Sequence, residues 1–202
     1  MSKGQLFVIS GPSGVGKGTI CKELLEQTNV KFSVSMTTRK PREGEVHGES
    51  YYFVSHEEFD KVIEQNGFLE HAEVYGNKYG TPLAETLKML EAGQDILLDI
   101  DTQGALNVKK VYPEGVFIFI LPPSMEELRN RIIGRGSETP ESLKIRLGQA
   151  LHEISYVDKY DYSVVNDSIE EAVERVKAIF VAEHSRVSTE IHKLIENYKE
   201  EL

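Results

Sequence analysis

The stretch Leu6-Phe-Val-Ile-Ser-Gly-Pro-Ser-Gly-Val-Gly-Lys-Gly-Thr19 decides the fold of this chain. Its first residues, 6–9, are all apolar, which is typical of a strand buried on both faces of a parallel sheet. A glycine-rich turn follows, and a helix is expected from Lys17 onward. Strand, glycine-rich turn and helix in this order indicate a P-loop, in which backbone N–H groups at a helix N-terminus bind phosphate.

We expect this P-loop to bind a nucleoside triphosphate, because Lys17 adds a positive charge where the β- and γ-phosphates would lie. The alternative is a glycine-rich turn that only connects a strand to a helix. It is less favoured, since the lysine and both flanking elements are present. The expected ATP-binding segment is Gly11, Pro12, Ser13, Gly14, Val15, Gly16, Lys17, Gly18 and Thr19.

The loop departs from the strict P-loop pattern at one position. Gly18 stands where the pattern has serine or threonine, and the hydroxyl comes one residue later, at Thr19. A magnesium ion that accompanies ATP is therefore expected to be held by phosphates, waters and a carboxylate. The loop itself provides no certain metal ligand.

Composition and charge restrict the location and the partners. The 202 residues, 40% hydrophobic and 28% charged, suit one globular domain. No stretch approaches the roughly 18 apolar residues of a membrane span, and no signal-peptide pattern begins the chain, so we expect a cytoplasmic protein. The net charge of −10 argues against nucleic-acid or anionic-membrane partners. The sequence leaves the oligomeric state open, a homo-oligomer included.

Two further residue types are informative. Arginines cluster at 39 and 42 and again between 129 and 146, which favours a small phosphorylated ligand in this acidic chain. The single cysteine, Cys21, cannot form an internal disulfide and is expected to pack inside a helix.

Apolar runs alternate with helix signals along the chain. Further runs with the length of buried strands are 96–100, Val116–Leu121 and 163–165. Serines that precede a glutamate by three residues, a pattern that begins helices, are Ser55, Ser124 and Ser168. Pro82 is expected to begin another helix and Gly93 to end it. This order predicts an α/β fold with a parallel sheet flanked by helices.

Two segments interrupt the alternation. Residues 32–84 are rich in aromatic and turn residues around one helix at 55–66, and we expect an inserted mixed α/β lobe. Residues 126–155 are expected to form a small helical lid with a mobile flap at 134–140. The core of this single domain is then expected to comprise 1–31, 85–125 and 156–202.

The C-terminal run beginning at Ile169 has the apolar spacing of one long surface helix, packed on the sheet by one face. Its apolar positions are Val173, Val176, Phe180, Val187, Ile191 and Leu194. We expect this helix to be purely structural.

Further motifs follow one another through the chain. They are SVSMTTRKPR at 33–42, Gly44-Glu45, Gly48, Tyr51-Tyr-Phe53, FLE at 68–70, YGNKYGT at 75–81, IDTQG at 100–104, Arg131, GRG at 134–136, Arg146 and VND at 165–167. With the P-loop, they resemble the guanylate kinase family over nearly the whole chain. The resemblance implies a P-loop core that carries a GMP-binding lobe and a lid. It also implies transfer of the γ-phosphoryl group of MgATP to GMP, and to dGMP as well, giving ADP and GDP.

The matched arginines have a chemical reason to bind GMP. Arg39 and Arg42 can form a forked clamp on its phosphate, helped by the hydroxyls of Tyr51 and Tyr79. The alternative is a solvated pair of loop charges beside two half-buried aromatic rings.

Glu70 is the residue expected to identify the base. A carboxylate there could accept both N1–H and N2–H of guanine, a pair that adenine lacks, and Ser35 and Thr81 could complete the edge of the ring. An exposed alternate position of a strand is the other interpretation of Glu70.

Asp99 and Asp101 flank Ile100 at the carboxyl end of an expected strand, where ligands of open α/β sheets collect. Either could reach a magnesium-bound water or the acceptor, and the sequence does not decide between them. A helix cap is a competing interpretation of Asp101, because Thr102 follows it.

Phosphoryl transfer depends on alignment and on neutralising the charge of the transferred oxygens. The expected catalytic residues are Lys17, Arg39, Arg131, Arg135 and Arg146. By resemblance, Asn166 and Asp167 lie near the adenine of ATP.

Two other functions compete with this one. The sequence GKGT also resembles adenylate kinases, but Glu70 and the paired arginines favour GMP. Guanylate-kinase-like modules of membrane-associated scaffolds bind proteins without catalysis. Those modules typically have an eroded P-loop, whereas this loop and Lys17 are intact.

Overall fold

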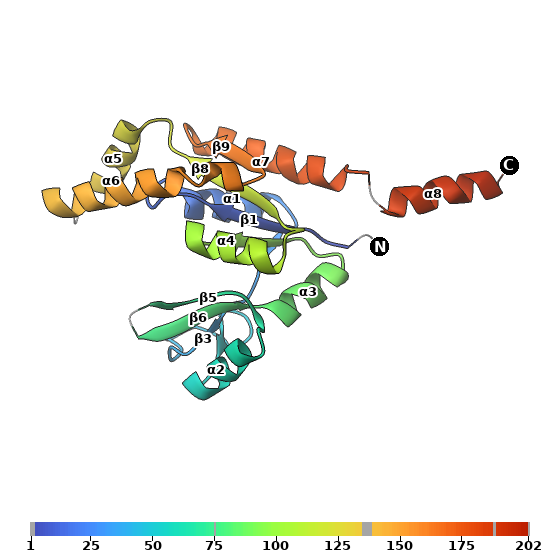
Figure 1. Cartoon of the computed structure of the whole chain (residues 1–202), viewed down its shortest axis with the longest axis horizontal. Helices are drawn as coiled ribbons and strands as arrows, with labels where there is room; N and C mark the ends of the chain where they lie inside the picture. Colours follow the sequence, from blue (N-terminus) through green and yellow to red (C-terminus); the bar gives the residue numbers. More distant parts are fainter. Residues whose placement is uncertain (1–2, 75, 135–138, 188, 202) are drawn as a thin grey trace.

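The computed structural model describes residues 3–74, 76–134, 139–187 and 189–201. Within them a parallel sheet has the strand order β2-β7-β1-β8-β9, and Figure 1 labels its strands β1, β8 and β9. Its strands are β1 (Leu6–Ser10), β2 (Lys31–Phe32), β7 (Ile96–Asp99), β8 (Val116–Leu121) and β9 (Tyr162–Val165). β1 is central and pairs in parallel with β7 and β8, so the P-loop leaves the middle of the sheet. The predicted α/β fold is confirmed.

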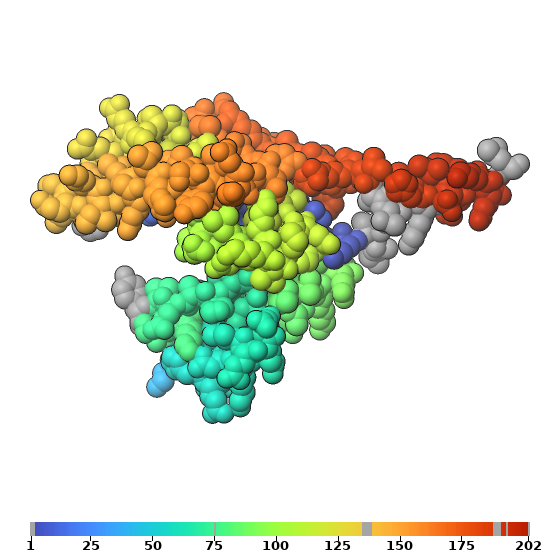
Figure 2. All heavy atoms as spheres, in the orientation of Figure 1, coloured from blue at the N-terminus to red at the C-terminus, as the bar shows by residue number. Residues whose placement is uncertain are grey.

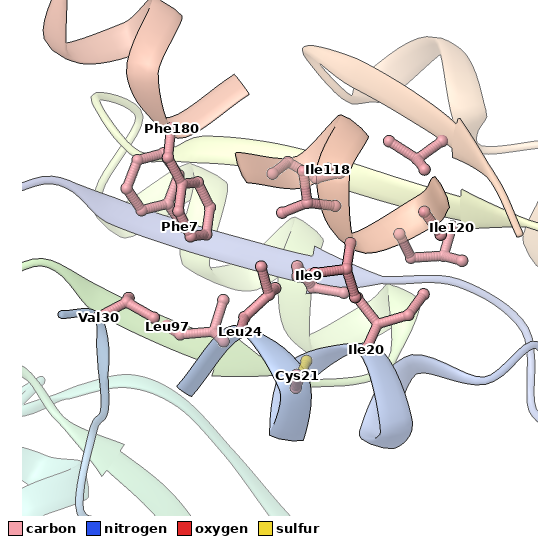
Figure 3. Close-up of a cluster of buried hydrophobic side chains, with 14 of the residues drawn as sticks. Phe7, Ile9, Ile20, Cys21, Leu24, Val30, Leu97, Ile118, Ile120 and Phe180 are labelled. Carbon is pink, nitrogen blue, oxygen red and sulfur yellow. The ribbon is translucent and has the colours of Figure 1, made fainter. Parts of the chain in front are cut away.

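Helices cover both faces of this sheet. One face carries α1 (Lys17–Gln27) and α7 (Ile169–His184), and the other carries α3 (Leu83–Glu91) and α4 (Thr102–Val111). Side chains of β1 alternate between the two cores. Phe7 packs on Phe180, with ring centroids 4.0 Å apart (Figure 3), whereas Val8 belongs to the core under α3 and α4. Cys21 is buried in the first core, and this burial raises the pKa of its thiol.

A second sheet, with strand order β4-β3-β6-β5, forms the inserted lobe. Its elements are β3 (Met36–Thr37), β4 (Tyr52–Phe53), α2 (His56–Glu64), β5 (Phe68–Val74) and β6 (Asn77–Pro82). Phe59 of α2 stacks on Phe68 of β5 with 4.5 Å between ring centroids, and Ser55 begins α2 through the predicted capping box. Phe32, the first residue of the expected lobe, instead pairs with β7, because β2 extends the core sheet by one strand.

The lid region contains α5 (Met125–Ile133) and α6 (Pro140–Ile154), and the 3-10 turn η1 (Val157–Lys159) follows. Both helices pack through an apolar cluster of their own, formed by Leu128, Ile132, Leu143 and Ala150. Ser124 caps α5, as predicted, and Thr139 caps α6, which the sequence prediction omitted. Residues 135–138 of the expected flap lie outside the described residues.

The prediction of one long C-terminal helix is wrong. α7 ends at His184, and a separate helix, α8 (Thr189–Glu200), runs away from the rest of the chain (Figures 1 and 2). Val187 is 77% exposed and Leu194 is 43% exposed, so the second half of the apolar spacing does not pack on the sheet. The 16 residues of α7 span about 24 Å, whereas the six residues of β8 extend only about 20 Å. The sheet therefore ends before α8 begins.

The remaining helix ends follow the sequence signals. Ser168 caps α7, and Gly93, with φ of 82°, follows the end of α3. Among the described residues, no helix is long and apolar enough to cross a membrane.

Candidate active site

The P-loop lies at the carboxyl-terminal edge of the parallel sheet, directly after β1. Gly11, Gly14 and Gly16 have φ of 145°, 89° and 102°, in the region that favours glycine. A Cβ atom on Gly16 would also lie 2.5 Å from Nδ2 of Asn166. Glycine at these positions therefore lets the loop curl tightly toward the start of α1.

Lys17 begins α1 and lies over the loop. Its Nζ donates to the carbonyl oxygens of Gly11, at 2.6 Å, and of Pro12, at 3.5 Å. The first turn of α1 contains no acidic residue, so the partial positive charge of the helix N-terminus is not neutralised there. An ammonium group and a helix N-terminus thus meet at a point suited to a polyphosphate.

Each lid helix brings an arginine to the P-loop. Arg131 of α5 donates from Nη1 to the carbonyl oxygen of Val15 at 3.4 Å, and from Nε to a glutamate of its own helix at 2.8 Å. Arg146 of α6 donates from Nη2 to the hydroxyl oxygen of Ser13 at 2.9 Å. Arg135, the third expected lid arginine, lies outside the described residues.

Asn166 and Asp167, which follow β9, have different surroundings. Asn166 is buried and donates from Nδ2 to the carbonyl oxygen of Val15 at 2.7 Å, so its side chain braces the P-loop. Asp167 is exposed and pairs with Arg175 of α7 at 3.2 Å. Of the two residues expected near adenine, Asn166 therefore contacts the P-loop, and Asp167 lies at the surface beside α7.

Asp99 and Asp101 also separate. A Cβ atom on Gly18 would lie 3.8 Å from Oδ2 of Asp99, so this carboxylate faces the start of α1. Asp99 reaches solvent, yet the surrounding protein partly desolvates it and raises its pKa, while the Lys17 ammonium lowers that pKa. Asp101 accepts from the Gly104 N–H at 2.7 Å and caps α4. Of this pair, Asp99 therefore lies beside the P-loop, and Asp101 has the helix-cap role.

In the lobe, Glu45 organises the two arginines of the expected phosphate clamp. Arg39 donates from Nη1 to Oε2 at 2.9 Å and from Nη2 to Oε1 at 2.8 Å. The Arg42 backbone N–H donates to Oε2 at 2.7 Å, and the Arg42 side chain stays exposed. The Arg39 guanidinium, and then the Arg42 N–H, lower the pKa of Glu45 to about 2.

Aromatic rings surround Arg39. Its Cζ lies 5.4 Å from the ring centroid of Tyr51 and 5.8 Å from that of Phe53, and the rings of Tyr51 and Tyr79 are 6.2 Å apart. Glu45 first, and then the Tyr79 hydroxyl, raise the pKa of the Arg39 guanidinium. Ser35 is half-buried nearby, and its carbonyl oxygen accepts from a backbone N–H of β4 at 2.9 Å. The residues expected to bind phosphate are thus gathered in one place.

Glu70 and Thr81 meet on the paired strands β5 and β6. The Thr81 hydroxyl donates to Oε1 of Glu70 at 2.8 Å. Burial raises the pKa of Glu70, and the Thr81 hydroxyl opposes this rise. Glu70 and Asp101 both line a hollow of about 140 Å³ between the lobe and α4. Glu70 is half-buried and lines a hollow, so it is not merely an exposed alternate position of a strand.

Two carboxylates of this region were missing from the predicted site residues. Glu45 has a signal in the sequence, since it follows Arg42 by three residues in the same loop. Glu153 of α6 is half-buried, and burial raises its pKa while the Lys17 ammonium lowers it. Its signal is weaker and consists of its spacing of seven residues from Arg146 on one helix.

The arrangement separates two sets of cations. The P-loop and the lid carry one set at the edge of the core sheet, and the lobe carries the other. In the space-filling view, lid and lobe face each other across an open wedge on the left (Figure 2). Two phosphorylated ligands can therefore lie end to end, one at the P-loop and one against the lobe.

Comparisons with known proteins indicate one family. The family model described as guanylate kinase matches residues 3–183. A guanylate kinase of Clostridium tetani is 62% identical over 187 residues, which cover 93% of this chain and 90% of the relative. A guanylate kinase of Clostridioides difficile is 51% identical over 203 residues, which cover 100% of this chain and 99% of the relative.

Solved structures agree. The crystal structure of a guanylate kinase from Anaplasma phagocytophilum matches with a TM-score of 0.68 and 41% identity, over 92% of this chain and 89% of that chain. The SH3-kinase fragment of tight junction protein 3 matches with a TM-score of 0.51 and 13% identity, over 92% of this chain and 60% of that one. At 13% identity, the second likeness concerns the fold alone.

Proposed function

The chain belongs to the guanylate kinase family, and on this premise we propose that it transfers the γ-phosphoryl group of ATP to GMP, giving ADP and GDP. The observation that carries the choice of acceptor is Glu70, a half-buried carboxylate bound by Thr81 at the hollow beside α4. Guanine offers N1–H and N2–H to such a carboxylate, and adenine does not. dGMP has the same base and phosphate and is proposed as a second acceptor.

The donor side neutralises charge. The backbone N–H groups of the P-loop and Lys17 bind the β- and γ-phosphates, while Arg131 and Arg146, with Arg135, surround the transferred oxygens. Their proposed role follows from chemistry, because charge spreads over these oxygens in the transition state. The contacts of Arg131 and Arg146 with the P-loop support this assignment.

The acceptor side aligns GMP. Arg39 and Arg42, with the hydroxyls of Tyr51 and Tyr79, bind its phosphate, and Arg39 exchanges Glu45 for that phosphate. The base lies against Glu70, Thr81 and Ser35, with Asp101 at the far side of the hollow. The lobe thus accelerates phosphoryl transfer by aligning the GMP phosphate with the γ-phosphate of ATP.

Magnesium is proposed to enter with ATP, and the residues present fit it. The Asp99 carboxylate faces Gly18, and Thr19 supplies an exposed hydroxyl in the same turn of α1. Within the described ranges, no group of three or more His, Cys, Asp or Glu side chains could hold a metal ion. Phosphate oxygens and waters would therefore complete its coordination, and the ion would neutralise charge on the β- and γ-phosphates.

Neither alternative function is favoured. A protein-binding module would not need the three P-loop glycines with positive φ or Lys17 over the loop. An adenylate-type kinase would leave Glu70 without the guanine donors. We further propose that the protein is cytoplasmic and acts in purine nucleotide metabolism. The lobe at 32–84 and the lid at 126–155 are proposed to be parts of one domain.

Lys17→Ala tests phosphoryl transfer directly. Removing this ammonium should lower kcat for ATP and GMP by about 100-fold or more, because it acts on transition-state charge. Lys22→Ala is the matched control, since Lys22 is exposed on the same helix, where it pairs with Glu26 at 3.8 Å. Coupled detection of ADP gives the rate, and thermal melting verifies the fold. A folded Lys17→Ala variant with wild-type turnover would contradict the proposed function.

A further inference from the structure

A hollow beside α4 lies outside the proposed ATP and GMP positions. It has a volume of about 470 Å³ and lies between α4 and the chain that ends α6 and continues into η1, two segments that are neighbours in Figure 1. We call it the lysine hollow, and its lining residues are Gln103, Leu106, Lys109, Lys110, Tyr156 and Lys159. Among the described residues that line it there is no carboxylate, although the whole chain has a net charge of −10.

Three ammonium groups give the lysine hollow its charge. Lys109 donates from Nζ to the carbonyl oxygen of Lys159 at 2.8 Å and to Oδ1 of Asp161 at 2.9 Å, so this one charge has an anionic partner. Lys110 donates only to the amide oxygen of Asn107, at 3.4 Å, which leaves its charge uncompensated. Within the described part of the chain, the Lys159 ammonium has neither a hydrogen bond nor an ion pair. The lysine hollow therefore has an excess of positive charge.

The same hollow has an apolar wall. Leu106 and Tyr156 are both half-buried there. The Tyr156 ring lies at a T-shaped angle to the ring of His152, with centroids 5.2 Å apart, and the Tyr156 hydroxyl is 3.3 Å from Nε2 of His152. These contacts fix the ring, and a fixed aromatic ring beside a leucine suits a planar base. The Gln103 amide adds a donor and an acceptor for the edge of such a base.

Size and charge together restrict the class of ligand. The volume lies within the roughly 300–1,000 Å³ of pockets that bind small molecules. A lone carboxylate needs one ammonium group, whereas a chain of phosphates spreads several charges over a length that lysines from two elements can follow. A lipid chain would need more apolar surface than one leucine and one ring. A nucleic acid would be repelled by the acidic remainder of the protein.

We propose that the lysine hollow binds a nucleoside polyphosphate, apart from the two substrate positions. The base lies against Tyr156 and Leu106, and the phosphates contact the ammonium groups of Lys110 and Lys159. This binding does not depend on the proposed function, because no residue of the P-loop takes part in it. Gln103 lines both the lysine hollow and the hollow beside Glu70, so the bound ligand contacts a residue that borders the acceptor side.

Calorimetry on a blocked enzyme tests the site. Both substrate positions are first filled with a bisubstrate compound, in which adenosine and guanosine are joined by a chain of phosphates. GTP, ATP and inorganic tripolyphosphate are then titrated as probes. We expect the two nucleotides to bind at one further site per chain, with a Kd below about 1 mM. Absence of any further binding of GTP and ATP overturns the proposal.

Charge reversal locates the phosphates. Lys159→Glu and Lys110→Glu should each weaken nucleotide binding to the blocked enzyme about tenfold or more, because each replaces a cation by an anion. Both lysines are exposed, so the core stays intact. Lys88→Glu makes the same change at an exposed position of α3 outside the hollow, and this matched control should stay within about twofold of wild type. Lysine variants that behave like the control overturn the lysine hollow as the site.

Tyr156→Ala distinguishes a nucleoside from free phosphate. It should weaken GTP and ATP binding about fivefold or more and leave tripolyphosphate binding within about twofold, because only the nucleotides have a base to stack. Thermal melting verifies the fold, and Tyr156→Leu, which keeps apolar bulk, replaces the alanine variant if that variant does not fold. Equal losses for nucleotides and tripolyphosphate overturn the base contact. A wild-type chain that does not bind the bisubstrate compound contradicts the proposed function alone, and the same titrations on the free chain then test the lysine hollow.

Discussion

At the scale of single residues, Arg39 illustrates how the site is prepared for its ligand. Two hydrogen bonds to Glu45 fix the orientation of its guanidinium, and the ring of Tyr51 lies 5.4 Å from Cζ. A phosphate group offers the same forked geometry with more charge than a carboxylate. Under the proposed function, the phosphate of GMP therefore replaces Glu45 while the Arg39 side chain keeps its rotamer.

Arg39→Ala should raise the KM for GMP about tenfold or more and leave the KM for ATP within about twofold, because a clamp on the acceptor binds ground and transition states alike. Steady-state kinetics with each substrate varied in turn measure both constants. Arg129→Ala, at an exposed position of α5, is the matched control. If the ATP constant rises instead, Arg39 belongs to the donor side.

The Arg39–Glu45 pair also predicts a pH dependence of stability. The pKa of Glu45 falls from 4.5 to about 2 on folding, so the pair stabilises the protein fully above about pH 4.5 and loses this contribution as the pH falls toward 2. The melting temperature of Glu45→Gln should therefore lie below that of wild type at pH 6, and the difference should shrink below about pH 4.5 and close as the pH reaches about 2. Glu57→Gln, at an exposed ion pair of the lobe, controls for the lost acidic charge. A constant difference across this range would show that Glu45 is not held by Arg39.

At the scale of helices and strands, Gly16 at the start of α1 and Gly148 within α6 have opposite effects on the stability of the fold. Gly16 caps α1 with φ of 102°, and a Cβ atom there would meet Asn166 at 2.5 Å. Gly148 lies within α6, where a Cβ atom would meet nothing within 4 Å. At position 16 the backbone conformation requires glycine, whereas Gly148 is in a helix and only adds conformational freedom to the unfolded chain.

Gly16→Ala should lower the free energy of unfolding by about 1–3 kcal/mol, because of backbone strain and the close contact. Gly148→Ala should raise that free energy by about 0.5–1 kcal/mol, the usual gain of alanine over glycine in a helix. Urea unfolding of both variants beside wild type measures the difference. Equal effects of the two substitutions would contradict the geometry of the P-loop.

Local signals explain why most elements could be predicted from the sequence. Buried strands, serine caps such as Ser55 and the P-loop itself depend on residues close together in the chain. The end of α7 depends on where the sheet below it stops, and the pairing of Phe32 depends on β7, more than sixty residues away. Neither the end of α7 nor the pairing of Phe32 can therefore be predicted from residues close together in the sequence.

The candidate site divides in the same way. Lys17 and the paired arginines stand in motifs, so their neighbourhood could be predicted. The cap formed by Asp101 was one of two open interpretations, and only the fold separates it from Asp99. Arg146 meets Ser13 across 133 positions of sequence, and no spacing rule connects them.

At the scale of the whole molecule, the cations that we propose for phosphoryl transfer come from three parts of the chain. Arg39 belongs to the lobe, Lys17 to the core and Arg146 to the lid, and lid and lobe face each other across an open wedge (Figure 2). Donor and acceptor phosphates repel each other, so both sets of cations must converge before transfer. We therefore expect closure, which would also exclude water from ATP.

Closure should require both nucleotides. Amide hydrogen exchange in β5, β6, α5 and α6 should slow most with GMP and a non-hydrolysable ATP analogue together, and much less with either alone. The strands of the core sheet provide the internal reference, since they are already buried. Unchanged protection of the lobe and the lid in the ternary complex would refute closure.

A single competition experiment measures acceptor choice most directly. GMP, AMP, CMP and UMP are mixed in equal amounts with limiting ATP labelled in its γ-phosphate, and the labelled diphosphates are separated. Because only guanine satisfies Glu70, label in GDP should exceed label in ADP, CDP or UDP by about 100-fold or more. Comparable label in GDP and ADP would contradict guanine recognition by Glu70 and with it the assignment of GMP as the acceptor.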